Sequence, residues 1–154
     1  MPRTGTFDDD LTALYRSQRD RLRRVAYLMT GNAAVAEEIV HDAFLRVHGR
    51  WDTIDTPGAY LRRTVVNLCL AWRERSALAR ERTPRSDGWV DPPELDETWA
   101  LLARLTREQR VALVLRYYED LPDEDIARIM GCRPATVRTR IHRALKALRK
   151  EMTP

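Results

Sequence analysis

Residues 121–150, LPDEDIARIMGCRPATVRTRIHRALKALRK, decide how this chain is organised. Apolar residues recur at helical spacing on both sides of a short break, which predicts two helices joined by a tight turn. Gly131 supplies the backbone freedom that a sharp turn requires, and Pro134 suits the first turn of the second helix, where no N–H donor is needed. The stretch therefore predicts a helix-turn-helix, a motif that presents its second helix to DNA.

Positive charge is concentrated on the second helix of this motif. Between Arg133 and Lys150 the sequence has seven Arg and Lys residues and no Asp or Glu, whereas the net charge of the whole chain is only +4. A local field of this sign attracts the phosphate backbone of nucleic acid. The charge distribution therefore favours DNA as a partner of this helix.

The bulk composition is that of a soluble globular protein. Of the 154 residues, 44% are hydrophobic and 32% are charged, which excludes disorder throughout. Cys69 and Cys132 form no CxxC pair, which argues against a disulfide framework or structural zinc. No apolar run approaches the length of a membrane span, so we expect a cytoplasmic protein without direct membrane insertion. The sequence stops soon after the basic helix, so we also expect no regulatory domain in cis.

Two helices are predicted before residue 50. An apolar stripe from Leu11 to Met29 predicts the first, with the acidic residues 8–10 capping its N-terminus. Thr30-Gly31-Asn32 closes this helix and opens a second one over residues 33–48. The residues predicted to face inward on the second helix are Ala36, Ile39, Val40, Ala43, Phe44 and Val47.

A third helix is predicted to begin at Thr56-Pro57, a capping hydroxyl followed by Pro, and to continue to about Arg80. Residues 83–93, TPRSDGWVDPP, have three Pro, one Gly and no helical period, which predicts a linker. Helical spacing resumes at Leu95, and residues 106–109 have capping-box spacing. No strand-like alternation occurs, so the predicted fold class is all-α, with two small helical domains joined by the Pro-rich linker.

The second predicted helix has a polar outer face. Its members are Glu37, Glu38, His41, Asp42 and Arg46. This face is either a solvated surface or a docking site for a basic partner. His41 and His48 lie two turns apart, but no further ligand has metal spacing to them, so we expect no metal site.

The third predicted helix combines positive charge with an aromatic group. It carries Tyr60, Arg62, Arg63 and Asn67, and Trp51 stands shortly before it. Phosphates require positive charge and unpaired bases require a π-surface, so this combination is typical of a groove for single-stranded nucleic acid. The alternative is that Trp51 and Tyr60 belong to the core.

Three stretches, in this order, resemble the extracytoplasmic-function sigma factors of the sigma-70 family, and in particular the SigE-like group of actinobacteria. They are AYLMTGNAAVAEEIVHDAFLRVHGRW, YLRRTVVNLCLAWRER and LTREQRVALVLRYYEDLPDEDIARIMGCRPATVRTRIHRALKALR. The resemblance implies sigma region 2 over residues 7–82, which binds core RNA polymerase and the −10 element. It also implies a linker over residues 83–93 and sigma region 4 over residues 94–152, which binds the −35 element.

The resemblance implies roles for individual residues of region 2. Glu38, His41 and Asp42 match positions that dock on the β′ clamp, with His41 in place of the more common Gln. The loop from Trp51 to Thr56 matches a site for a flipped base. The implied −10 DNA-binding residues are Trp51, Tyr60, Arg62, Arg63 and Asn67.

Region 4 has a corresponding set. The implied −35 DNA-binding residues are Arg133, Thr136, Arg138, Thr139, Arg140, His142 and Arg143. Of these, Arg138, Thr139, His142 and Arg143 match base-facing positions, whereas Thr136 and Arg140 match phosphate contacts. An Arg at a base-facing position can pair with O6 and N7 of guanine. Arg133 stands at the N-cap of the recognition helix, where it lacks a capping oxygen.

The resemblance implies a non-enzymatic subunit that directs core RNA polymerase to specific promoters and assists promoter melting. Its implied partners are the β′ clamp and β flap of the polymerase, promoter DNA and an anti-sigma factor. The alternative is a stand-alone helix-turn-helix repressor or activator. It would explain the basic helix, but neither the acidic face of the second predicted helix nor the basic and aromatic face of the third. No Gly-rich phosphate loop, Ser/His/Asp set or metal spacing supports an enzyme, so no cofactor or small-molecule substrate is expected.

Overall fold

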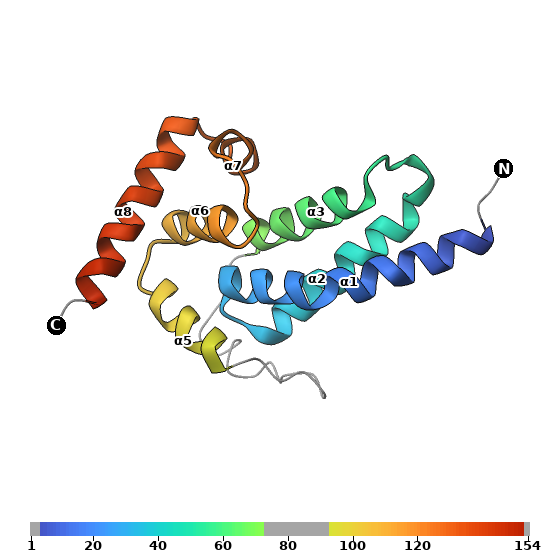
Figure 1. The fold of residues 1–154 in the computed structure, drawn as a ribbon, viewed down its shortest axis with the longest axis horizontal. Helices are drawn as coiled ribbons and strands as arrows, with labels where there is room; N and C mark the ends of the chain where they lie inside the picture. The colour runs from blue at the N-terminus through green and yellow to red at the C-terminus, as the bar shows by residue number, and fades with distance from the viewer. Residues whose placement is uncertain (1–3, 73–92, 153–154) are drawn as a thin grey trace.

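The computed structural model describes residues 4–72 and 93–152, and this part of the chain contains helices and no strands (Figure 1). The all-α prediction is therefore confirmed. Most of the predicted linker lies outside the described residues. In the described part no helix is long and apolar enough to cross a membrane, and no three His, Cys, Asp or Glu residues are grouped to hold a metal ion. The elements are α1 (Thr4–Thr30), α2 (Ala33–Gly49), η1 (Trp51–Thr53), α3 (Pro57–Ala71), α5 (Pro93–Leu102), α6 (Arg107–Tyr117), α7 (Asp123–Met130) and α8 (Pro134–Met152).

Helices α1, α2 and α3 pack together around the N-terminal part of the core. Gly31, with a left-handed φ of +70°, separates α1 from α2. The side chain of Asn32 then caps α2 by accepting a hydrogen bond from the Val35 amide (3.0 Å). All six residues predicted to face inward on α2 are buried, which confirms both the helix and its orientation.

Three helix ends differ from the sequence expectation. Helix α1 begins at Thr4, so residues 8–10 lie beyond its first turn and do not cap it. Thr56 is the N-cap of α3, as predicted, but its hydroxyl makes no capping hydrogen bond. Helix α3 ends at Ala71, whereas the sequence predicted an end near Arg80, and residues 73–80 lie outside the described residues.

The end of α3 is capped by a side chain from a distant segment. The guanidinium of Arg107, in the first turn of α6, donates to the main-chain carbonyls of Cys69 (3.5 Å), Leu70 and Trp72 (3.4 Å). Carbonyls at a helix C-terminus lack donors within the helix, and a cation there also suits the helix dipole. Because the capping group comes from a distant part of the chain, the local sequence does not mark this end.

Helices α6, α7 and α8 form a second unit that contains the helix-turn-helix. The Thr106 hydroxyl accepts from the Gln109 amide (3.2 Å), and the Gln109 side chain accepts from the Thr106 amide (3.3 Å). The predicted capping box is therefore confirmed. Helix α7 ends at Met130, its C-cap Gly131 has a left-handed φ of +67°, and Pro134 is the first residue of α8, as expected for a tight turn at Gly131.

The two units share a packed interface. Helix α1 contacts α5 and α6, and α3 meets α7. The Trp99 ring of α5 lies so close to Gly31 that a Cβ there would overlap the indole. The Tyr27 hydroxyl of α1 donates to the Asp96 carboxylate of α5 at 2.8 Å. Residues from both units consequently belong to one continuous core.

Candidate nucleic-acid interface

The outward face of α8 carries the residues predicted to contact bases. Val137 and Ala144 are fully buried on the side that packs against α6 and α7. Their burial fixes the rotation of the helix, because residues three and four apart share a face. The base-facing candidates Arg138, Thr139, His142 and Arg143 are all exposed. The structure therefore brings these four side chains together on one surface.

The other three predicted −35 residues, Arg133 at the helix start and the two phosphate candidates Thr136 and Arg140, lie beside this surface. Arg133 is exposed, and its carbonyl accepts the first amide bonds of α8, from Thr136 (3.0 Å) and Val137 (3.2 Å). Thr136 and Arg140 are half-buried. Arg140 also donates to the Cys132 sulfur at 3.6 Å. These three residues border the base-facing surface near the start of α8.

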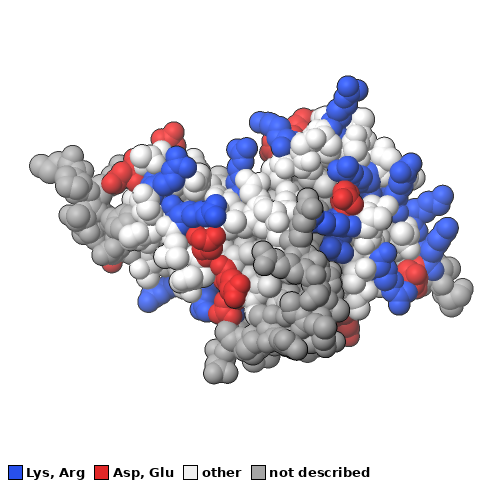
Figure 2. All heavy atoms as spheres, turned by 180° about the vertical axis from the view of Figure 1, so that it is seen from behind, with Lys and Arg blue, Asp and Glu red and all other residues white. Residues whose placement is uncertain are grey.

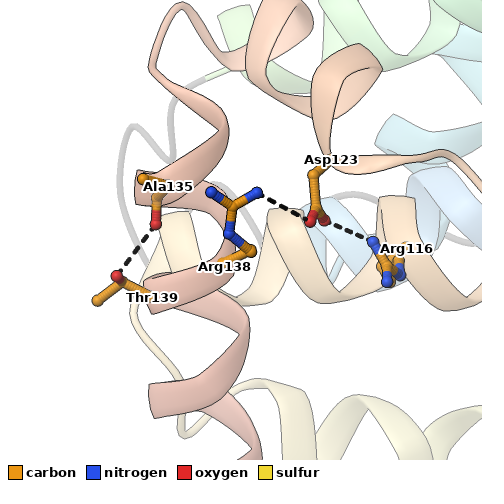
Figure 3. Close-up of polar contacts among 5 residues, drawn as sticks. All are labelled: Arg116, Asp123, Ala135, Arg138 and Thr139. Atoms are coloured by element: carbon orange, nitrogen blue, oxygen red, sulfur yellow. Dashed lines mark hydrogen bonds and ion pairs between the residues drawn. The ribbon is translucent and has the colours of Figure 1, made fainter.

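Positive side chains gather along the edge of the molecule that α8 forms, at the right of Figure 2. Within this surface the Thr139 hydroxyl donates to the Ala135 carbonyl one turn earlier (3.0 Å; Figure 3). Its proton is therefore used inside the helix, and only its acceptor lone pairs are available to a ligand. The arginines consequently supply most of the donors on this surface.

Two adjoining hollows lie along α3, and Tyr60 and Arg63 line both of them. The larger hollow, of about 560 Å³, extends along α3 past Asn67 and reaches Arg46 of α2. The smaller, of about 330 Å³, lies against the loop after η1 and reaches Arg50. A cation and an aromatic ring at the junction of two hollows can hold a phosphate and an unstacked base.

Arg50 organises the smaller hollow. Its Nη1 donates to the Tyr60 hydroxyl at 3.2 Å, and its guanidinium carbon lies 5.9 Å from the centre of the Tyr60 ring. Its own carbonyl accepts from the Thr53 amide (2.9 Å) and hydroxyl (2.8 Å). The ring at the junction is thereby held in place. The sequence analysis did not assign Arg46 or Arg50 to this site, although the two arginines lie one helical turn apart and Arg50 directly precedes Trp51.

Two predicted −10 residues lie apart from these hollows. Trp51 is half-buried against the core and lines neither of them. Arg62 leaves α3 toward the C-terminal unit, where its Nε lies 3.3 Å from a carboxylate oxygen of Glu119. The structure therefore brings together Tyr60, Arg63 and Asn67, but not the full predicted set.

Glu119, just after α6, is a buried charge at the contact between the two units. Its side chain is fully buried, and its oxygens lie 3.7 Å from Arg21 Nε and 3.3 Å from Arg62 Nε. Neither oxygen accepts a hydrogen bond from the described residues. Burial raises the pKa of Glu119 above its ordinary value, and the two arginines offset this only in part. No local sequence pattern reveals this cluster, because Arg21 and Arg62 are distant from Glu119 in the sequence.

The exposed face of α2 carries the residues predicted to dock on polymerase. Glu38 and His41 are exposed, and Asp42 pairs with Arg46 one turn along the helix (3.3 Å). Leu45 of the same helix is 58% exposed and adds an apolar side chain to this face, which the sequence analysis did not single out. The predicted set is therefore present on one accessible surface.

Comparison with known proteins identifies relatives along most of the chain. The Sigma-70 region 2 family matches residues 14–78, and the Sigma-70 region 4 family matches residues 95–148. The RNA polymerase sigma-E factor of Streptomyces coelicolor is 32% identical over 147 residues, which cover 89% of this chain and 82% of that protein. The extracytoplasmic function sigma factor SigJ of Mycobacterium tuberculosis superposes with a TM-score of 0.63 at 29% identity, over 89% of this chain and 52% of that one. The sigma factor RpoE of Bartonella quintana, solved with the anti-sigma factor NepR, shares the fold (TM-score 0.65, 20% identity, 94% and 95% coverage).

Proposed function

Because the chain belongs to the extracytoplasmic-function sigma factors of the sigma-70 family, which direct core RNA polymerase to specific promoters and assist promoter melting, we propose that three of its surfaces divide this work. The α2 face binds core polymerase, the hollows on α3 hold the melted −10 strand, and the outward face of α8 recognises the −35 element. The observation that carries the proposal is that Tyr60 and Arg63 line both hollows. An aromatic ring stacks on unpaired bases, and a neighbouring cation binds their phosphates.

At the −10 element, one base enters the hollow beside Arg50 while the strand continues along α3 toward Asn67. Unstacking a base costs a few kcal/mol, and stacking on an aromatic side chain returns about 1–3 kcal/mol per base. Arg63 neutralises the backbone of the same strand. Trp51 supports the loop from the core side, and Arg62 joins the −10 contacts only when it leaves Glu119.

At the −35 element, the exposed row on α8 enters the major groove. Arg138 and Arg143 have the donors to pair with guanine, and each correct pair provides about 1–3 kcal/mol of discrimination. Thr139 and His142 complete the base-facing set. The phosphate contacts come from Arg133, Thr136 and Arg140, and they set the register on the duplex without selecting a sequence.

Core polymerase is bound through Glu38, His41 and Asp42, which offer acidic and polar groups to a basic surface of the β′ clamp. The C-terminal unit contacts the β flap. We place region 2 at residues 7–82, the linker at 83–93 and region 4 at 94–152, boundaries that the matched ranges 14–78 and 95–148 support. We propose the cytoplasm as the location, because core polymerase is the proposed partner.

Sigma factors are non-catalytic initiation factors, and we propose that this chain likewise acts without catalytic activity, cofactor or small-molecule substrate. We also propose an anti-sigma factor as a regulatory partner. Such a protein should compete with core polymerase for the chain, which a competition pull-down would show. A chain that keeps its full polymerase affinity in the presence of every co-purifying protein would argue against this partner.

Binding to core polymerase is the decisive test. We expect the purified chain to bind core and to support transcription from selected promoters. Asp42→Lys should weaken binding because it reverses a charge on the docking face, whereas Asp20→Lys, at an exposed position of α1, should not. A chain that binds DNA but not core polymerase would instead be a stand-alone repressor or activator.

The −10 assignment is tested by binding to single-stranded promoter DNA. Arg63→Ala and Tyr60→Ala should weaken binding of the holoenzyme to the non-template −10 strand, because they remove the cation and the ring shared by both hollows. Arg24→Ala, which removes an exposed Arg from α1, is the matched control. Equal effects of Arg24→Ala and Arg63→Ala would show that only net charge matters and would refute the assignment.

A further inference from the structure

Asp123, the first residue of α7, stands between arginines from two other helices (Figure 3). It accepts a hydrogen bond from Arg116 of α6 through Oδ1 (2.5 Å), and its Oδ2 lies 3.7 Å from Nη1 of Arg138 on α8. The side chain of Asp123 is 16% exposed, whereas that of Arg138 is 61% exposed. A largely buried carboxylate therefore lies at one end of a guanidinium that otherwise faces solvent.

The Asp123 carboxylate is itself held in place. It lies in the first turn of α7, where free amide groups and the helix dipole favour negative charge. Arg116 binds its other oxygen. Asp123 and the two arginines together carry a net charge of +1 beside the surface proposed for DNA. The next two acidic residues of α7 do not share this arrangement. Glu124 is exposed, and Asp125 accepts a hydrogen bond from Arg128 of its own helix (2.9 Å).

Arg138 benefits from such a contact because its side chain is long and flexible. Pairing with O6 and N7 of guanine requires the planar guanidinium in one orientation. A carboxylate beside one nitrogen restricts the rotamers of the side chain and leaves its other N–H groups free to donate. Arg143, by comparison, has no ion pair within the part of the chain that the structure describes.

We propose that Asp123 is a positioning residue for −35 recognition, which orients the Arg138 guanidinium so that this side chain selects one base pair. The proposal rests on the proposed function, in which Arg138 contacts a base. Asp123 acts through Arg138 and touches no DNA itself. Its effect is therefore confined to the promoter position that Arg138 contacts.

The test is transcription by reconstituted holoenzyme from a promoter library with a randomised −35 element, at saturating core polymerase. Asp123→Asn keeps the shape of the side chain and removes its charge. Glu124→Gln removes the same charge one residue away and is the matched control. We expect Arg138→Ala to relax the preference at one −35 position. Asp123→Asn should reduce the preference at that same position by about threefold or more, whereas Glu124→Gln should retain the wild-type preference.

A double variant separates positioning from a general structural effect. Once Arg138 is replaced, adding Asp123→Asn should relax the preference no further, because a residue that acts only through Arg138 then has nothing to orient. Additive losses of preference would overturn the proposal. So would a uniform loss of transcription from all −35 sequences in Asp123→Asn, or no change at the position that Arg138→Ala affects. If Arg138→Ala leaves the base preference unchanged at every −35 position, the base contact proposed for Arg138 is wrong, and the role of Asp123 that depends on it is overturned as well.

Discussion

Replacing Gly31 with Ala should destabilise the protein more than the same replacement at Gly131. Both glycines adopt left-handed backbone conformations, with φ of +70° and +67°. The backbone strain of Ala is therefore similar at the two sites, about 1–2 kcal/mol. A Cβ at Gly131 would meet nothing within 4 Å, whereas one at Gly31 would come within 2.7 Å of Trp99 Cε2 and closer to two other ring atoms. Overpacking of this kind adds about 1–3 kcal/mol, so we expect a total of about 2–5 kcal/mol at Gly31.

Urea denaturation followed by far-ultraviolet circular dichroism measures both losses. The additional loss at Gly31 should disappear in a Trp99→Ala background, because removal of the indole leaves only the backbone strain. Equal losses for Gly31→Ala and Gly131→Ala in the wild-type background would refute the reasoning. Such a result would mean that Trp99 of α5 does not pack on the turn between α1 and α2 in solution.

Three further predictions concern a buried charge, a helix cap and a base contact. The pKa of Glu119 is raised in the folded state above its ordinary value, near 4.5. Between these two pKa values the folded protein binds more protons than the unfolded chain, so the contribution of Glu119 to stability falls as pH rises. The free energy of unfolding of Glu119→Gln, measured by urea titration, should therefore rise relative to that of the wild type as pH is raised from 4.5 to neutral. A relative fall over this range would show that the pKa of Glu119 is lowered instead. Thr106→Ala removes the capping box of α6 and should lower the free energy of unfolding by about 1 kcal/mol. Calorimetry should therefore show a lower unfolding temperature, and an unchanged unfolding temperature would contradict the prediction. Arg143→Ala should relax the preference at one −35 position in the promoter library, whereas equally weaker binding to all sequences would make it a phosphate contact.

Much of the fold and part of the candidate site follow from local sequence patterns. The inward face of α2, the capping box at Thr106 and the tight turn at Gly131 were all predicted correctly. The helical spacing of apolar residues in the second helix of the helix-turn-helix belongs here too, because Val137 and Ala144 of that helix are buried and Arg138 and its neighbours lie on the outward face. These features depend on residues within about one or two helical turns of each other, so their spacing alone carries the information.

The remaining features depend on contacts between distant segments. Arg107 caps the end of α3 from another helix, and Glu119 draws Arg62 away from the hollows that Tyr60 and Arg63 line. Asp123 reaches Arg138 of α8 in the same way, through a contact across the helix-turn-helix. Thus the sequence by itself determined which helices form and which side of each faces the core, because periodicity and capping are local. Only the tertiary structure decided which group caps the end of α3 and which charged groups pair, because charged side chains pair with whatever packing brings near them, and their sequence positions carry no periodic signal of those partners.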